Sequence, residues 1–383
     1  MRGPILITGA TGFVGMELVA RYLEQTDRTV IALVRAVDDA EARARLTAAV
    51  ERVLPDASRY GDRLVAVAGD VTLPRLGLDR RRWRALAAQV DEIIHAAASV
   101  SFTLGLQESR AINVEGTRRM LHFALGCQAS RGLARFSYVS TAYVAGTHRG
   151  TFAEADLHRG QGFRNAYERS KHEAETLVSA HADRLPIQVF RPSIVVGEED
   201  SGWTPSFNVI YWPMRAFSRG AYSALPARRR SPVDVVSISY VADAIVALSA
   251  LDDGAGETYA LAAGPRASTV GELLALSAGA FGRRAPWTVP AGLYRHTLHR
   301  LLLRRADARR RKTLEASEVF FPYFTMRQRF DTSRACARLE PLGIRPAPLP
   351  AYFDRLVAFA LHADWGKREV PRRAAAGELA LAS

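Results

Sequence analysis

The chain has little cysteine: Cys127 and Cys336 are its two cysteines among 383 residues, and they form no CxxC pair. A disulfide-stapled fold needs many more, and a zinc site usually places its cysteines close together. The cysteine content therefore argues against disulfides and against a zinc site, and we expect no metal. It is typical of a reducing compartment, so we expect a cytoplasmic protein.

Long apolar runs are also missing. The apolar stretch 235–251 is interrupted by Asp243, so it is too short to cross a bilayer. At the N-terminus, Ile5–Thr8 leads directly into a glycine turn and does not resemble a signal peptide. The last residues carry no lipidation or peroxisomal signal.

Acidic residues are outnumbered by basic ones, which gives a formal net charge of +13. This excess favours an anionic partner such as coenzyme A, the acidic face of a carrier protein, nucleic acid or a membrane surface. A nucleic-acid motif is absent, and no aromatic residues interleave with the basic ones, so we expect no nucleic-acid partner.

Basic residues crowd the segment 295–312, where leucines recur at roughly helical spacing at positions 293, 298, 301 and 302. The pattern indicates a basic amphipathic helix. Such a helix could recruit an acidic acyl donor or make a peripheral membrane contact through 293–312. An ordinary solvated surface helix explains the same pattern.

What the sequence does contain is an apolar strand, Ile5–Thr8, followed by glycines three residues apart at Gly9, Gly12 and Gly15. In the first βα turn of a dinucleotide-binding sheet, the first glycine allows a tight turn and the second lets the backbone approach a pyrophosphate. The third lets the helix pack closely on the strand. The phosphates would lie at the N-terminus of the helix expected over 12–25.

Further strand-like runs alternate with Ala/Arg/Glu-rich helical segments, at 29–34, 64–68, 92–97, 136–140 and 187–190. This βαβ alternation predicts an α/β fold with a doubly wound parallel sheet. Because 383 residues exceed the size of one ordinary core, we also expect a second, smaller lobe of mixed structure. Ligands of such sheets bind at the carboxyl ends of the strands.

The second strand ends at Arg35 with no acidic residue to bind a ribose hydroxyl, and a guanidinium there can bind a 2′-phosphate. This favours NADP(H), with Arg45 as a second phosphate ligand or as a solvated helix residue. The third strand ends at Asp70, which could accept a hydrogen bond from an adenine amino group or simply form a turn. His95, near the end of the fourth strand, is interpreted as a core histidine.

The fifth strand ends at Thr141, and Tyr167 and Lys171 follow with a spacing of four. On a helix, positions four apart share a face, so both side chains would point into the same cleft. A nearby ammonium, together with the positive ring of the oxidised cofactor, is expected to favour the tyrosine phenolate and to let it exchange protons near neutral pH. Thr141 would donate a second hydrogen bond to the reacting oxygen.

With these motifs the chain resembles an extended short-chain dehydrogenase/reductase over about residues 3–265. The matching segments, in order, are TGATGFVG, GDV, HAAASV, NVEGT, YVSTAYV, YERSK and FRPSIVVGE. Within that group, LVRA, Thr141 and LPIQVFRPSIVVGE are most similar to the thioester reductase and fatty acyl-CoA reductase branch.

The resemblance implies catalysis by Thr141, Tyr167 and Lys171. It implies NADP(H) as cofactor, bound by residues of the glycine turn, of the strand ends and of the YERSK helix. These are Gly9, Thr11, Gly12, Phe13, Val14, Gly15, Arg35, Arg45, Asp70, Val71, Ala96, Ala97, Ala98, Asn113, Tyr167, Lys171, Pro192 and Ser193.

The activity that the resemblance implies is NADPH-dependent reduction of an acyl thioester to an aldehyde. Whether the aldehyde is released or reduced again to an alcohol is left open. No adenylation or carrier segment is recognisable, so we expect the acyl group to arrive on coenzyme A or on an acyl carrier protein. A dehydrogenase, ketoreductase or epimerase acting on a sterol, sugar or polyketide would use the same residues. A non-catalytic NADP-binding protein is a more distant alternative, because such relatives usually lose the tyrosine or the lysine.

We expect residues 1–197 to form the NADP-binding domain, with its sheet completed by about 233–265. Segments 198–232 and 266–365 would form the substrate lobe, and 366–383 a flexible tail. The aromatic residues at 203–213 and 320–324 are interpreted as core of this lobe, with a substrate tunnel as the alternative. The loop after Gly197 differs from that of plant and animal acyl reductases, which leaves the acyl group open.

Overall fold

The computed structural model describes residues 3–54, 56–294 and 299–375. Seven strands form one parallel sheet in the order β12-β7-β5-β4-β1-β2-β3. The strands are β1 (Ile5–Thr8), β2 (Val30–Val34), β3 (Leu64–Ala68), β4 (Glu92–His95), β5 (Arg135–Val139), β7 (Ile187–Pro192) and β12 (Thr258–Leu261). From β1 the chain adds β2 and β3 on one side of the sheet, and it then returns to add β4 and the later strands on the other side. This reversal of strand order confirms the predicted doubly wound α/β fold.

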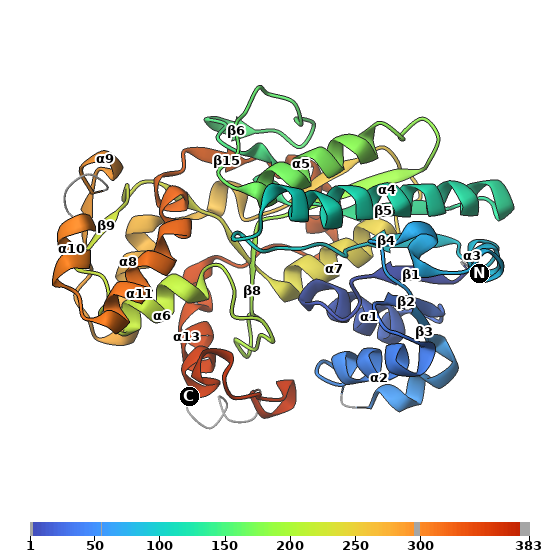
Figure 1. Ribbon diagram of the computed structural model, residues 1–383, viewed down its shortest axis with the longest axis horizontal. Coiled ribbons are helices and arrows are strands. Elements are labelled where there is room, and N and C mark those ends of the chain that lie inside the picture. Colours follow the sequence, from blue (N-terminus) through green and yellow to red (C-terminus); the bar gives the residue numbers. More distant parts are fainter. Residues whose placement is uncertain (1–2, 55, 295–298, 376–383) are drawn as a thin grey trace.

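Helices cover both faces of the sheet (Figure 1). Alternate residues of β1 explain this, because Ile5 and Ile7 enter one apolar core and Leu6 enters the other. The first core is closed by α1 (Phe13–Gln25), α2 (Asp39–Val50), α7 (Ile238–Ser249) and α12 (Ser333–Leu339). The second is closed by α3 (Arg80–Ala87), α4 (Leu106–Arg131) and α5 (Ala166–Ser179).

A further core lies at the end of the molecule away from α2 and α3 (Figure 1). Its helices are α6 (Tyr211–Ser218), α8 (Val270–Phe281), α11 (Ala308–Ser317) and α13 (Phe353–His362). Short strand pairs accompany it: β9 (Ala224–Pro226) with β14 (Trp287–Val289), and β10 (Pro232–Val233) with β13 (Ser268–Thr269). Two others lead to the large sheet: β8 (Ile194–Val196) with β11 (Val235–Ser237), and β6 (Gly150–Phe152) with β15 (Gln328–Phe330).

The segment expected to form one basic amphipathic helix is divided in the structure. A short helix, α9 (Ala291–Leu293), precedes it, and α10 (His299–Arg305) and α11 follow, separated at Ala306 and Asp307. Asp307 is a favourable residue at a helix N-terminus, and its carbonyl accepts from Arg311 N at 2.9 Å. Residues 295–298 and the side chains of Arg300, Arg305, Arg309 and Arg310 lie outside the described part, so the proposed role of the segment stays a prediction.

Residues 366–375, expected to begin a tail, pack against the body of the protein. The indole nitrogen of Trp203 donates to the Val370 carbonyl at 3.0 Å, and Arg372 forms an ion pair with Glu198. Ala375 is buried. The opposite charges at 198 and 372 are 174 positions apart, so sequence inspection could not pair them. Residues 376–383 lie outside the described part.

Among the helices of residues 3–54, 56–294 and 299–375, none is long and apolar enough to cross a membrane.

Close packing between α3 and α4 generates a prediction about stability. A Cβ atom at Gly126 of α4 would lie 2.3 Å from the Trp83 ring of α3. Overpacking costs about 1–3 kcal/mol, whereas alanine gains about 1 kcal/mol over glycine within a helix. We therefore expect Gly126→Ala to lower the free energy of unfolding in denaturant titrations.

Gly279 of α8 is the matched control, because it is exposed and a Cβ there would meet nothing within 4 Å. Gly279→Ala should raise the free energy of unfolding by about 0.5–1 kcal/mol. Equal gains at both positions would show that α3 and α4 can separate without cost.

Candidate active site

The glycine turn after β1 brings two backbone segments into close contact. Gly9 has φ +72°, and a Cβ there would lie 2.8 Å from the Ala96 carbonyl carbon. A Cβ at Gly15 would lie 2.0 Å from the Gly9 oxygen, so α1 could not pack on the turn with any larger residue. A Cβ at Gly12 has only the Gly9 oxygen, at 3.2 Å, nearby. The first and third glycines are required by packing, and the second leaves space beside the backbone.

The N-terminus of α1 supplies the groups that a phosphate would need. Gly12 precedes this 13-residue helix and no side chain caps it. The first backbone N–H groups of a helix have no partner within the helix and carry partial positive charge. Here they lie beside the open space at Gly12, a combination that fits a pyrophosphate.

A cleft at the carboxyl ends of β1, β4, β5 and β7 collects many of the residues that the sequence predicts. They are Gly9, Gly12, Phe13, Val14, Gly15, Ala96, Ala98, Thr141, Tyr167, Lys171, Pro192 and Ser193. Ser193 is buried in the wall, where its side chain interacts with the Asp234 carboxylate. The open space at Gly12 and the small residues that line the cleft fit a dinucleotide.

Other predicted cofactor residues lie outside the lining of this cleft: Thr11, Arg35, Arg45, Asp70, Val71, Ala97 and Asn113. Arg35 follows β2 and is exposed, and the Arg45 guanidinium donates to the Arg35 carbonyl. Arg45 therefore holds the backbone of Arg35. Asp70 Oδ1 accepts hydrogen bonds from Thr72 N and Thr72 Oγ1, both at 2.7 Å. These bonds form a turn, which is the alternative role that the sequence offered for Asp70.

Asn113 and Ala97 have structural contacts. Asn113 accepts from Ser99 N at 2.8 Å and donates to the Ser99 carbonyl at 3.1 Å and to Ser170 Oγ at 2.9 Å. These bonds tie the loop after β4 to α4 and α5 and leave the amide away from the cleft. Ala97 N donates to Thr8 Oγ1 at 3.2 Å. Val71 packs beside Gly116 of α4.

Lys171 is buried on α5, and its amine is held by the wall of the sheet. Nζ donates to Tyr138 OH and to the Val139 carbonyl, both at 2.8 Å. Burial lowers the pKa of Lys171 to about 7, although the Glu175 carboxylate opposes this by favouring the charged form. The amine is thus close to half charged at neutral pH.

Tyr167 lies beside Thr141, as predicted. Burial raises the pKa of Tyr167 to about 12, while a hydrogen bond with Thr141 lowers it. Burial is thus the dominant influence on the phenol, and Lys171, whose own pKa is lowered by burial, carries less positive charge to oppose it. Tyr167 is therefore protonated at neutral pH and equipped to donate a proton. The combined effect of Lys171 and an oxidised cofactor ring on Tyr167 stays a prediction.

Two aromatic residues that sequence reasoning did not assign to the site complete its wall. The Phe102 ring lies 5.6 Å from that of Tyr167 and is stacked on Tyr323 at 5.3 Å. Tyr323, in the 3-10 helix Glu318–Thr325, donates to Glu168 Oε1 at 2.8 Å and accepts from Asn165 Nδ2 at 2.7 Å. One sequence signal could have pointed to these residues. Phe102 lies two positions after the HAAASV motif, and Glu168 lies within YERSK.

His95 is a core histidine, as interpreted. It is 1% exposed, and its ring nitrogens contact Thr8 Oγ1 at 2.7 Å and Thr117 Oγ1 at 3.1 Å. Burial, with a smaller contribution from the charge of Lys171, lowers the pKa of His95 to about 3. It stays neutral at physiological pH.

No set of three or more histidine, cysteine, aspartate or glutamate side chains within the described ranges is arranged to hold a metal ion.

Comparison with known proteins places the chain in context. Residues 7–245 match the NAD-binding family described as "Male sterility protein". A carboxylic acid reductase from Mycobacterium marinum is 32% identical over 285 residues, covering 67% of this chain and 24% of that protein. An isonitrile lipopeptide synthase from Mycobacterium tuberculosis is 34% identical over 275 residues, covering 64% of this chain and 11% of that protein. The chain therefore spans a quarter or less of the length of these relatives.

Among solved structures, the terminal R domain of the myxalamid PKS-NRPS biosynthetic pathway has the same fold. The TM-score is 0.81 at 24% identity, and the alignment covers 96% of this chain and 92% of that one.

The charge of Lys171 can be measured directly, because Lys171, Lys312 and Lys367 are the lysines of the chain. In NMR titration of protein with isotope-labelled lysine side chains, we expect one signal to titrate near pH 7. Lys171→Met should remove this low-pKa signal, and Lys367→Met, which alters an exposed lysine, should retain it. The absence of any lysine signal that titrates near pH 7 would contradict the burial effect.

Proposed function

Because the chain belongs to the male sterility protein family of NAD-binding proteins, of the extended short-chain dehydrogenase/reductase type, we propose that it reduces acyl thioesters to aldehydes with NADPH. The observation that carries the proposal is the gathering of Thr141, Tyr167 and Lys171 in the same cleft as the glycine turn. Curated relatives include a carboxylic acid reductase, and a structural relative is a terminal R domain.

The chemistry divides between cofactor and protein. NADPH, when bound, supplies a hydride to the thioester carbonyl carbon. Thr141 and Tyr167 donate hydrogen bonds to the carbonyl oxygen, where negative charge develops. Each donor of this kind can contribute about 3–4 kcal/mol to stabilisation of the transition state. Tyr167 gives its proton to that oxygen, and the resulting hemithioacetal breaks its C–S bond to release the thiol and the aldehyde. A second reduction would give the alcohol.

Lys171 orients the site rather than reacting. Its amine is positioned by Tyr138 and Val139 at the end of β5. Lys171 lies on the same face of α5 as Tyr167. In its charged form it would donate to the cofactor ribose and favour transient negative charge on Tyr167.

We further propose that the acyl group arrives on coenzyme A or on an acyl carrier protein, and that the substrate lobe comprises 198–232 and 266–365. A structural relative is described as a thiolation-reductase di-domain, which supports a carrier-bound donor. The net charge of +13 is favourable for either anionic donor.

Tyr167→Phe tests the proposed acid. The variant keeps the ring but loses the proton, so turnover with an acyl thioester should fall by at least about 10². NADPH binding, measured by fluorescence, should change little. Tyr352→Phe is the control, since it removes a buried hydroxyl outside the cleft that has no hydrogen-bond partner within the described residues. Normal turnover in a folded Tyr167→Phe protein would show that another group supplies the proton.

Arg35→Ala tests the preference for NADPH. Arg35 is exposed at the end of β2, where a guanidinium can bind the 2′-phosphate. We expect dissociation constants, measured by calorimetry, to rise by about 10-fold or more for NADPH and little for NADH, in keeping with a charge-assisted bond of about 1.5–3 kcal/mol. Arg84→Ala, an exposed position on α3, should affect neither cofactor. Equal losses for both cofactors would make Arg35 a structural residue.

A further inference from the structure

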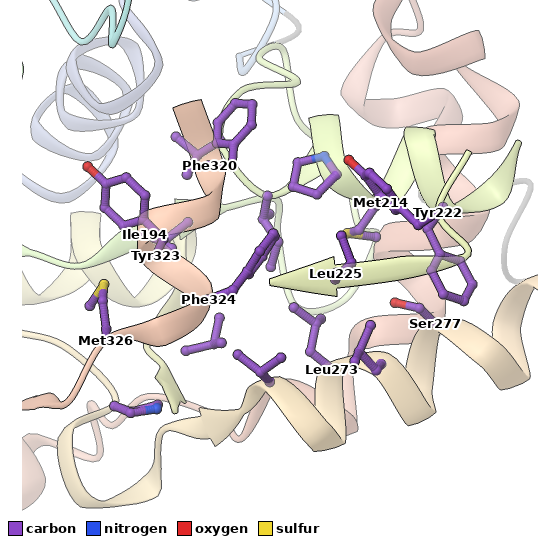
Figure 2. A pocket seen from close by; sticks show the side chains of 18 of the residues that line it. Ile194, Met214, Tyr222, Leu225, Leu273, Ser277, Phe320, Tyr323, Phe324 and Met326 are labelled. Atoms are coloured by element: carbon purple, nitrogen blue, oxygen red, sulfur yellow. The ribbon is translucent and has the colours of Figure 1, made fainter. Parts of the chain in front are cut away.

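A second cavity lies in the smaller lobe, between α6, α8, β9 and the 3-10 helix Glu318–Thr325. Its walls come mainly from apolar and aromatic side chains of these elements. Figure 2 shows Met214, Leu225, Leu273, Phe320 and Phe324 pointing into it from several sides. Part of the aromatic sequence that we interpreted as core therefore lines a cavity, while Trp203, Phe207 and Tyr211 pack in the core.

This cavity lies next to the candidate active site. Tyr143, Ile194, Val209 and Tyr323 line both spaces. Ile194 follows Pro192 and Ser193 at the end of β7, and Tyr323 stacks on Phe102 beside Tyr167. In Figure 2, Ile194 and Tyr323 lie at one end of the cavity and Tyr222 and Ser277 at the other. The cavity thus leads away from the reacting groups and deeper into the smaller lobe.

The cavity offers almost no hydrogen-bonding groups to a ligand. Two of its tyrosine hydroxyls are occupied, since Tyr222 OH pairs with Ser317 Oγ at 2.6 Å and Tyr323 OH with Glu168 Oε1 at 2.8 Å. Their rings face the cavity as apolar surface. A polar group that enters here would lose its hydrogen bonds to water and find no replacement. Each missing hydrogen bond lowers the affinity by roughly 10- to 100-fold.

The space is narrow, with a volume of about 70 Å³. This exceeds the roughly 10–15 Å³ that a single water-sized group occupies, and a methylene group is of similar size. The cavity therefore has room for more than one such group.

Together these observations assign a substrate class to the proposed reductase, on which this inference rests. We propose that the cavity is the acyl subsite and that it takes an unbranched aliphatic chain. The thioester carbonyl would lie at Thr141 and Tyr167, and the chain would pass Ile194 and Tyr323 toward Ser277. Peptidyl and other polar acyl groups are disfavoured, because they would leave amide groups unpaired among aromatic rings.

A chain-length series tests this inference. The probes are S-acyl pantetheine thioesters from acetyl to palmitoyl, assayed by NADPH oxidation, with a glycyl thioester as the polar comparison. Each methylene that enters an apolar site is worth about fourfold in affinity. We expect kcat/KM to rise at about this rate as long as added methylene groups enter the cavity, and then to level or fall. A flat profile from acetyl to palmitoyl, or faster reduction of the glycyl thioester, would overturn the proposal.

Two variants move the boundary in opposite directions. Leu273→Ala enlarges the cavity from α8 and should shift the optimum to longer chains. Ser277→Leu fills the end away from the cleft and should lower kcat/KM for octanoyl by about 10-fold or more while leaving butyryl unchanged, because each excluded methylene loses its fourfold contribution. Leu356→Ala is the matched control, since Leu356 belongs to the same apolar core but does not line the cavity. It should lower stability and leave the chain-length profile as in the natural protein.

Thermal shift measurements separate this inference from the proposed activity. If no thioester is reduced but octanoyl pantetheine raises the melting temperature more than acetyl pantetheine does, and Ser277→Leu removes that difference, the subsite stands and the reductase proposal fails. If thioesters of all lengths are reduced equally, and Leu273→Ala and Ser277→Leu match the Leu356→Ala control, the reductase stands and the subsite fails.

Discussion

The buried ion pair between Glu175 and Arg191 is the constraint on which the geometry of the cleft depends. Arg191, in β7, donates to Glu175 of α5 through Nε at 2.9 Å and Nη2 at 2.5 Å, and Ser140 donates to the other carboxylate oxygen. Both charged side chains are almost completely buried. Removing one partner of such a pair costs about 3–5 kcal/mol, because the other charge is left in a poorly solvated place. The pair therefore fixes α5 against the ends of β5 and β7. It thereby also positions Lys171 and Tyr167, which lie about one and two turns before Glu175 on the same helix.

The sequence was sufficient for those parts of the fold and site that depend on local pattern. Glycine spacing identifies the turn because only glycine fits at Gly9 and Gly15, and a spacing of four places Tyr167 and Lys171 on one helix face. Parallel strands end at one edge, so the strand-end residues gather there without knowledge of any contact. Contacts between distant segments could not be predicted in this way. Glu168 meets Tyr323 across 155 positions, and no periodic pattern connects them.

Electrostatic details were beyond the sequence for a different reason. The spacing of Tyr167 and Lys171 predicts proximity, but the charge of each depends on burial and on competing partners. Tyr138 and the Val139 carbonyl take up the lysine amine, and burial then dominates both pKa values. Likewise, the sequence could not show that Asn113 joins the loop after β4 to α5 through Ser99 and Ser170, and its role toward a cofactor stays a prediction. A motif identifies a residue, and its neighbours decide what that residue does.

The hydrogen bonds around Glu168 also limit how this protein can be recombined. Glu168 is fully buried on α5, and it is satisfied by Tyr323 and by Arg164, which in turn donates to Gln328 at 2.6 Å. A chimera that kept the first 265 residues and took the remainder from another member of the family would leave this carboxylate without one of its donors, directly beside Tyr167. Grafting a new smaller lobe would therefore require residues 323 and 328 to be carried over with α5. The exchangeable unit is thus defined by this network and not by the boundary of the sheet.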